Sequence, residues 1–207
     1  MMVALNFNWW GYTFQDGLNV LSQSFTSARD ALRRDIELAQ EEAIGYEDSV
    51  AQGLVEPDIE RDEDGYVILD HADVLQMHVE RAEECAMGLR KAIVIAAYHH
   101  WERSARGWTQ SERGNHLKLV ELSLAQDYPI DAKLGAVRDL VNLLKHASEK
   151  WGNDLVASWP EVFPPNFQKS SKTDWYESVW LTDKHVFEVL TILGSSGPKT
   201  NNASPAP

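Results

Sequence analysis

The chain alternates long segments of helical periodicity with short segments rich in Gly, Pro and acidic residues. Over 20–44, and again over 72–106, apolar residues recur every three or four positions, as one buried face of a helix requires. At 1.5 Å per residue, the second segment would form a helix of about 50 Å. Both segments therefore predict amphipathic helices, of which the second is the long one, with Gly107 as its expected end.

Shorter helices are predicted in the second half of the chain. The spacing from Thr109 to Glu112 is that of a capping box, and Gly152 is a natural stop for the helical pattern before it. Near the end of the chain, Thr182 or Asp183 offers an N-cap. These signals predict three further helices, over 111–126, over 131–151 and from Thr182 or Asp183 through Leu193.

Four segments break the helical pattern. Aromatic residues with interspersed Asn over 3–13 predict a short extended lead, and the acidic stretch 45–64 predicts a loop or an exposed insertion. Residues 65–69 predict a short strand, one half of a hairpin, whereas the Pro-rich stretch 159–180 predicts an irregular wrap anchored by aromatic side chains. The predicted fold class is all-α: a bundle of about five helices with one long helix and a minor extended or hairpin element.

Length and composition favour one compact domain with a tail. A chain of 207 residues with 43% hydrophobic and 25% charged residues can bury a substantial core. The predicted helices place a single helical domain at 1–193. Gly, Ser, Asn and Pro dominate 194–207, which we therefore expect to be a disordered C-terminal tail.

The formal net charge of −13 narrows the possible ligands. It disfavours broad, nonspecific wrapping of nucleic acid, which needs clustered Lys and Arg. Eight acidic residues and one Arg lie between Glu56 and Asp73. The rest of the chain is therefore closer to neutral and can still hold a local basic pocket.

Cysteine usage and hydropathy bear on location. Cys85 is the only cysteine, and its place on the apolar face of the predicted helix 72–106 predicts packing rather than nucleophilic chemistry. The N-terminus lacks the basic start and apolar run of a secretion signal. No apolar run approaches the roughly 20 residues of a membrane span. We expect a cytoplasmic protein without membrane contact.

One polar group lies near the end of the predicted helix 72–106. The sequence Tyr-His-His-Trp-Glu-Arg places His99, His100, Glu102 and Arg103 where Lys and Glu would normally face solvent. A histidine can exchange a proton near neutral pH, a carboxylate can hold its tautomer, and a guanidinium can hold a phosphate. These four residues form a candidate catalytic group for phosphodiester cleavage. The alternative is a structural ion-pair network between helices.

A second polar group lies on the predicted helix 131–151. Arg138, Asn142 and Lys145 follow one flank beside its apolar face, and His146 lies four positions after Asn142. We predict that the first three bind the substrate and that His146 belongs to the catalytic set. The alternative is that the cationic side chains only snorkel along the core, although a half-buried Asn needs partners.

No motif points to a metal or a cofactor. The seven histidines lack the spacing of a zinc site, and the chain has no Gly-rich phosphate loop, dinucleotide fingerprint or nucleophile elbow. We predict neither metal ligands nor a cofactor. Four other histidines are isolated in the sequence and receive no predicted chemistry: His71, His78, His116 and His185.

Several stretches resemble a known family. The hexapeptide from Tyr98 to Arg103, the sequence Leu-Leu-Lys-His at 143–146, and the stretches at 151–155 and 159–163 are similar to bacterial helical proteins of the HEPN type. The resemblance implies a helical bundle, usually dimeric, that often acts as a metal-independent ribonuclease in toxin–antitoxin or anti-phage systems. Active HEPN proteins carry an Arg followed, after four to six residues, by a His, and this chain has no such pair.

The sequence thus predicts one function and keeps one alternative. The predicted function is a HEPN-like endoribonuclease of a bacterial defence or toxin–antitoxin system. A histidine would take the proton of a ribose 2′-OH, and Arg103 or Arg138, with Lys145, would stabilise the phosphate charge. RNA and a second copy of the chain are its expected partners. The alternative is a non-catalytic helical module that binds an antitoxin or another protein through the acidic span 56–73.

Overall fold

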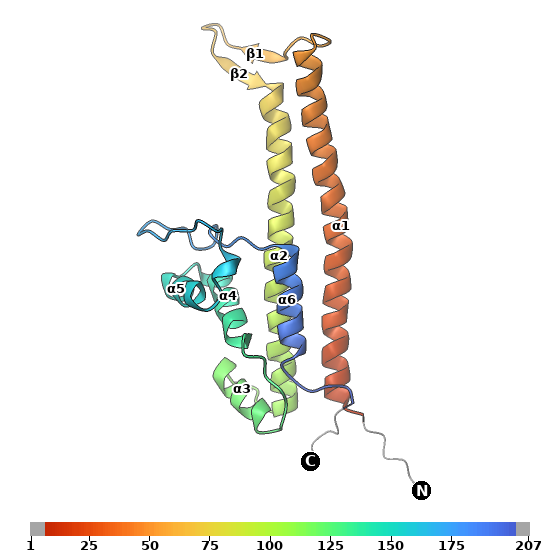
Figure 1. Cartoon of the computed structure of the whole chain (residues 1–207), viewed down its shortest axis with the longest axis vertical. Helices are drawn as coiled ribbons and strands as arrows, with labels where there is room; N and C mark the ends of the chain where they lie inside the picture. Colours follow the sequence, from red (N-terminus) through yellow and green to blue (C-terminus); the bar gives the residue numbers. More distant parts are fainter. Residues whose placement is uncertain (1–6, 202–207) are drawn as a thin grey trace. The chain divides into compact units, whose positions relative to one another are not determined.

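The computed structural model describes residues 7–201 and confirms an all-α fold with a small extended element (Figure 1). The described part holds six α-helices, one 3₁₀ turn and one two-stranded antiparallel sheet. Residues 1–6 and 202–207 lie outside it, and with them the first part of the predicted lead 3–13 and the end of the predicted tail. No described helix is both long and apolar enough to cross a membrane.

Two long helices flank a hairpin in the sequence, and four shorter helices follow. The long helices are α1 (Trp9–Ala51) and α2 (His71–Thr109), and the predicted hairpin is confirmed as β1 (Ile59–Arg61) paired with β2 (Val67–Asp70). The remaining elements are α3 (His116–Leu124), α4 (Leu134–His146), α5 (Glu149–Ser158), the 3₁₀ turn η1 (Pro160–Val162) and α6 (Asp183–Gly194).

Contacts divide the chain into two compact units, and both include parts of the single domain that the sequence predicts at 1–193. The larger one, called the core unit, combines the chain up to Phe25 with the chain from Arg90 onward. The smaller one, called the hairpin unit, covers Thr26–Leu89. Both boundaries fall inside the long helices α1 and α2, so each helix contributes to both units.

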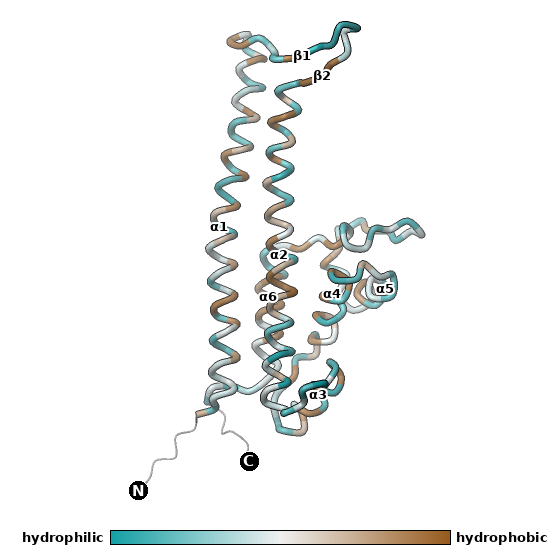
Figure 2. Tube along the Cα trace, turned by 180° about the vertical axis from the view of Figure 1, so that it is seen from behind, coloured by the Kyte–Doolittle hydropathy of each residue, from teal (hydrophilic) through white to brown (hydrophobic). Residues whose placement is uncertain are grey.

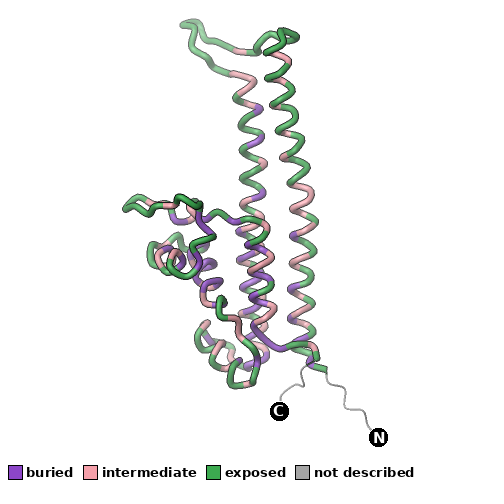
Figure 3. Tube along the Cα trace, in the orientation of Figure 1, coloured by how far each residue is buried: buried purple, intermediate pink, exposed green. Residues whose placement is uncertain are grey.

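Large apolar side chains fill the core unit. Trp101 and Trp159 are fully buried, together with aliphatic residues of α4 and α6 (Figure 3). Two buried tryptophans donate hydrogen bonds: Trp101 Nε1 to the Ser196 carbonyl at 2.6 Å, and Trp108 Nε1 to Ser123 Oγ at 2.9 Å. Burial of apolar area, which contributes about 25 cal/mol per Å², is the main term that stabilises this unit.

The hairpin unit buries far fewer residues than the core unit. No residue from Thr26 to Asp70 is buried. Cys85 is exposed, so the prediction that it packs in an apolar face is wrong. Its neighbour Ala86 lies on the buried face of α2, and the Cys85 thiol faces solvent. The buried side chains of this unit are Leu75, Val79 and Ala86.

The start of α1 differs from the predicted extended lead. The helix begins at Trp9, so the prediction of an extended lead is wrong from that residue on. Asn8 explains the early start, because its Oδ1 accepts the Gly11 N–H at 2.9 Å and caps the helix. At its other end the helix passes Gly45 and ends at Ala51, since a glycine costs an exposed helix only about 1 kcal/mol.

Two glycines that were predicted to end helices lie inside helices instead. Gly107 lies within α2, where a Cβ would come 2.7 Å from a ring carbon of Trp10. Gly152 lies within α5, where a Cβ would clash with the ring of Trp175. In both cases the missing side chain permits a close contact between a helix and an aromatic ring.

The predicted helix 131–151 is in fact two helices, α4 and α5. Ala147 adopts a left-handed conformation with φ of 47°, which ends α4. The helix α3 begins later than predicted, at His116. Its N-cap is Asn115, whose Oδ1 accepts the Lys118 N–H at 3.0 Å.

The last part of the chain confirms two predictions and differs from another. The stretch 159–180 is irregular apart from η1, and Thr182 caps α6 through its side chain. Residues 194–201 were expected to be disordered but pack within the core unit. Ser196 is fully buried there, and a backbone hydrogen bond of 2.8 Å joins the Asn8 N–H to the carbonyl of residue 200.

Candidate functional site

A pocket of about 520 Å³ in the core unit brings parts of both predicted polar groups together. It lies where the end of α2, the start of α3 and one face of α4 meet. We call it the cationic pocket. Its polar and charged lining residues are Tyr98, Glu102, Arg106, Arg113, Asn115, His116, Arg138, Asn142 and Lys145.

Positive charge dominates the cationic pocket although the whole chain carries a net charge of −13. Four cationic side chains line it against the carboxylate of Glu102. That carboxylate lies 3.8 Å from Arg106 Nη2 and 3.2 Å from His99 Nδ1. Arg113 and Lys145 form no hydrogen bond or ion pair with any side chain in the described chain. The pocket therefore offers two unpaired cations to an anionic ligand.

Arg138 is held in place by its neighbours. Its Nε and Nη2 lie 2.8 and 2.6 Å from Oδ1 of the buried Asp139. Its guanidinium carbon lies 5.6 Å from the ring centroid of Trp151, a cation–π contact. Burial raises the pKa of Asp139, and the hydrogen bond from Arg138 opposes that rise. A guanidinium fixed in this way loses little conformational entropy when it binds a phosphate.

His116 contributes an imidazole for which the sequence pattern predicts no role. Its Nδ1 lies 2.9 Å from the Tyr98 Oη. Burial, and next the charge of Arg138, lower the pKa of His116 to about 4, so the ring is neutral near pH 7. Burial, and next the charge of Glu102, raise the pKa of Tyr98, so the phenol keeps its proton. When Nδ1 donates to the Tyr98 oxygen, Nε2 of His116 is free to accept a proton from a ligand.

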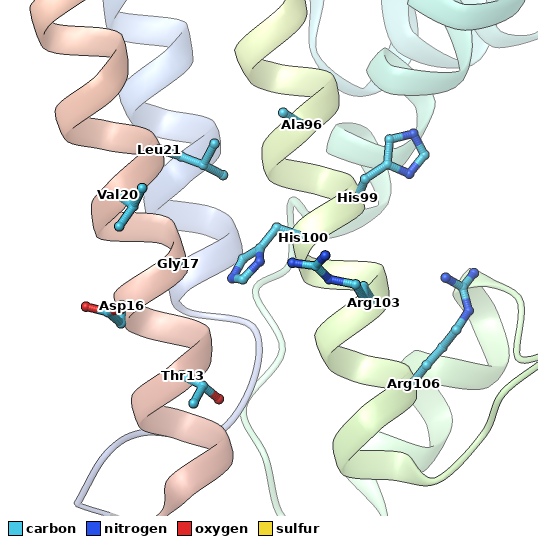
Figure 4. A pocket seen from close by; sticks show the side chains of 10 residues that line it. All are labelled: Thr13, Asp16, Gly17, Val20, Leu21, Ala96, His99, His100, Arg103 and Arg106. Atoms are coloured by element: carbon cyan, nitrogen blue, oxygen red, sulfur yellow. The ribbon is translucent and has the colours of Figure 1, made fainter.

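A second pocket, of about 770 Å³, lies between α2 and the first part of α1 within the core unit (Figure 4). His100 points toward Gly17 of α1, and its ring stacks on Phe14. Its Nε2 lies 3.0 Å from the Phe14 carbonyl oxygen. Because a carbonyl only accepts, this Nε2 carries a proton and donates it. The hydrogen bond and the stacking give His100 a packing role between the two helices.

The structure separates the predicted catalytic residues. Glu102 joins the three predicted substrate-binding residues in the cationic pocket, and His99 contacts that pocket through its hydrogen bond with Glu102. His99, His100 and Arg103 line the second pocket, and Arg103 has no ion-pair partner in the described chain. His146 is exposed and lines neither pocket. The two predicted groups thus meet through Glu102 and not through the predicted imidazoles.

Sequence reasoning missed His116 and Arg113. One local signal was available, because Asn115 is a favourable N-cap and fixes His116 in the first turn of α3. The approach of His116 to Tyr98, 18 positions earlier, depends on how the chain returns after α2. No periodic pattern in the sequence encodes that return.

The arrangement is suited to bind an anion and to move a proton. The pocket is lined by Asn115, His116 and Leu117, so the positive end of the α3 dipole opens into it. Asn142 forms no side-chain hydrogen bond in the described chain and can offer its amide to a ligand. Among the described residues, no cluster of three His, Cys, Asp or Glu side chains is placed to hold a metal ion.

The lowered pKa of His116 predicts a pH dependence of stability. The folded state disfavours its protonation, so its contribution is complete above the ordinary pKa of 6.5 and is lost as the pH falls toward 4. The slope is at most about 1.4 kcal/mol per pH unit for one proton. His116→Asn cannot titrate and should lose this slope. Urea unfolding of the wild type and of His116→Asn at several pH values between 4 and 6.5 measures this slope. If the free energy of unfolding changed equally with pH in both proteins, the lowered pKa of His116 would be contradicted.

Comparisons with family models, with curated proteins and with solved structures give no match to this chain.

Proposed function

We propose that this chain is a metal-independent endoribonuclease of a bacterial defence or toxin–antitoxin system, with its chemistry in the cationic pocket. The observation that supports the proposal is a neutral imidazole, His116, among four cationic side chains in one pocket. RNA cleavage without a metal needs a base for the ribose 2′-OH and positive charge for the phosphate. The resemblance to HEPN proteins supports the same assignment.

In the proposed reaction, Arg113 and Lys145 bind the scissile phosphate, and Arg138 stabilises the charge that develops on its oxygens. His116 takes the proton of the adjacent 2′-OH, and the freed oxygen attacks the phosphorus. The bond between phosphorus and the 5′-oxygen breaks, this oxygen takes a proton from water, and protonated His116 gives its proton to the hydroxide that remains. The products are a 2′,3′-cyclic phosphate and a 5′-hydroxyl end.

The charge of a bound phosphate changes the pKa of His116, the proposed base. In the free pocket, burial and Arg138 hold the pKa of His116 at about 4, which makes it a weak base. A bound phosphate places negative charge among the cations and offsets their field. It therefore raises the pKa of His116 toward its ordinary value of 6.5. The base becomes stronger when the substrate is in place.

The decisive assay is cleavage of a short single-stranded RNA by the purified protein in EDTA. We expect products with a 2′,3′-cyclic phosphate end, identified by mass spectrometry. The matched substrate carries a 2′-deoxyribose at the cleaved position, and it should bind with the same affinity and stay intact. Cleavage of that substrate, a requirement for added metal, or the absence of RNA cleavage would each contradict the proposal.

Removal of either unpaired cation should weaken RNA binding. Arg113→Ala and Lys145→Ala should each raise the Kd for the 2′-deoxy substrate at least about tenfold, because a hydrogen bond to a charged group contributes about 1.5–3 kcal/mol. The slope of log K against log salt should fall by about 0.7 for each lost phosphate contact. Filter binding at several salt concentrations measures both quantities.

Lys118→Ala is the matched control for these two variants. Lys118 lies on α3, pairs with Glu121 at 2.9 Å and does not line the cationic pocket. Its removal should leave the Kd within about twofold of the wild-type value. Equal losses in the control and in the pocket variants would argue against a defined phosphate site.

The proposal includes the homodimer that the HEPN resemblance implies and a cytoplasmic location. A second candidate function is a non-catalytic module that binds a protein partner. The observation that favours it is the concentration of negative charge and exposed apolar side chains in the hairpin unit. The two functions are compatible, because the cationic pocket lies in the core unit.

A further inference from the structure

The hairpin unit carries the whole net charge of the chain. The segment 26–89 contains 18 acidic and 5 basic side chains, a net charge of −13, whereas the rest of the chain contains 14 of each. Eight of these acids lie between Glu56 and Asp73, on and around β1 and β2. Such a surface is poorly suited to contact a second copy of itself, because like charges would face one another.

Apolar side chains are exposed on the same hairpin. Val67, Ile68 and Leu69 are 49, 65 and 42% exposed, and Figure 2 shows apolar β2 beside the hydrophilic loop that joins it to β1. Successive residues of a strand point to opposite faces, so neither face of the sheet is covered within the described chain. The sheet has two short strands and both its outer edges are open in the described structure. A two-stranded hairpin gains stability from a third strand.

Several contacts shape the hairpin before any partner binds. Asp62 Oδ1 accepts the N–H of Asp64 at 3.0 Å and of Tyr66 at 2.8 Å, which fixes the turn. The Tyr46 hydroxyl accepts the Asp58 N–H at 2.9 Å, just before β1. The two strands are therefore paired in advance, with one irregularity of register between Glu60 and Arg61, and this lowers the entropic cost of adding another strand.

We propose that the β1–β2 hairpin is the docking site for a basic protein partner, which adds an extended segment as a third strand. That segment alternates Lys or Arg with β-branched apolar side chains. Its main chain pairs with an open edge of the hairpin. Its side chains cover the exposed apolar residues and face the surrounding carboxylates. Charge favours this occupant over a second copy of the chain, and the proposal does not depend on ribonuclease activity.

The test uses the full-length protein and a fluorescein-labelled peptide of sequence Lys-Val-Lys-Ile-Lys-Val-Lys, with fluorescence anisotropy as the readout. The matched probe has Glu in place of every Lys. We expect saturable binding of the Lys peptide, weaker at high salt, and at least about tenfold weaker binding of the Glu peptide.

Two variants separate the effect of charge from that of apolar contact. A triple variant with Glu56→Gln, Glu60→Gln and Glu63→Gln should weaken Lys-peptide binding about tenfold near physiological salt, where distant charges are screened. Ile68→Ser, as a separate variant, should weaken Lys-peptide binding a few-fold by removing apolar area. The matched control removes three carboxylates from α1 in the same unit: Glu41→Gln, Glu42→Gln and Glu47→Gln. Circular dichroism checks that every variant keeps its helices.

Three outcomes would overturn the docking site. The first is no binding of the Lys peptide at any salt concentration, and the second is equal affinity for the two peptides or equal losses in the triple variant and its control. The third is self-association that Ile68→Ser abolishes in analytical ultracentrifugation, because a second copy would then occupy the hairpin. RNA cleavage should be unchanged in all hairpin variants, so failure of this proposal and failure of the ribonuclease proposal are observed separately.

Discussion

Replacing His116 by Asn should lower the rate of RNA cleavage by about 10²–10⁴-fold, the usual contribution of a general base. The Asn side chain places a polar atom near the position of Nδ1 and so preserves a partner for Tyr98, which lies 2.9 Å from that nitrogen. It has no counterpart of Nε2 and cannot take the proton of the 2′-OH. Because Arg113 and Lys145, rather than His116, bind the phosphate in the proposed reaction, the loss should appear in kcat rather than in KM.

Two other histidines are controls for this experiment. His99 and His146 are exposed imidazoles that the sequence pattern places in the catalytic group. His99→Ala and His146→Ala should cleave within a few-fold of the wild-type rate, and thermal unfolding should show that all three variants are folded. Wild-type cleavage by His116→Asn would exclude the cationic pocket as the active site. A loss confined to His99→Ala would assign the proton transfer to His99 with Glu102.

Periodicity predicts the helices of this chain well and their ends poorly. The apolar spacing in α1 and α2 reflects one covered face, a requirement that repeats every turn and is visible locally. The helix ends depend on single contacts, such as Trp10 against Gly107 and Trp175 against Gly152. A glycine permits a close approach as readily as it stops a helix, so the sequence alone does not distinguish the two uses.

The residues of the candidate site on α4 can be predicted from the sequence, whereas His116 on α3 cannot. Arg138, Asn142 and Lys145 stand at helical spacing beside an apolar face, so α4 alone places them at one border of the core. His116 joins them because of the tertiary path of the chain after α2. Charge shows the same limit: the acidic span 56–73 is visible in the sequence, whereas the division into units of net charge −13 and 0 requires the contacts.

Replacing Trp101 by Ala should lower the free energy of unfolding by about 3–5 kcal/mol, the usual effect of truncating a buried Trp. The side chain is fully buried, its ring stacks on Tyr98 with 5.8 Å between centroids, and its Nε1 donates to the Ser196 carbonyl at 2.6 Å. The substitution leaves a cavity and a buried carbonyl without its donor, and each destabilises the fold. Urea unfolding followed by circular dichroism measures the change.

Trp180→Ala is the matched control, because the same side chain is 58% exposed there and should contribute less than about 1 kcal/mol. Equal losses at the two positions would contradict the packing of the core unit.

Trp101 also supports the cationic pocket, since its ring centroid lies 5.6 Å from that of His116 and its ring stacks on Tyr98. At temperatures where Trp101→Ala is folded, RNA cleavage should therefore fall while the hairpin still binds the Lys peptide. If Trp101→Ala lost both RNA cleavage and Lys-peptide binding to the same extent, the two units would share the contacts that stabilise them.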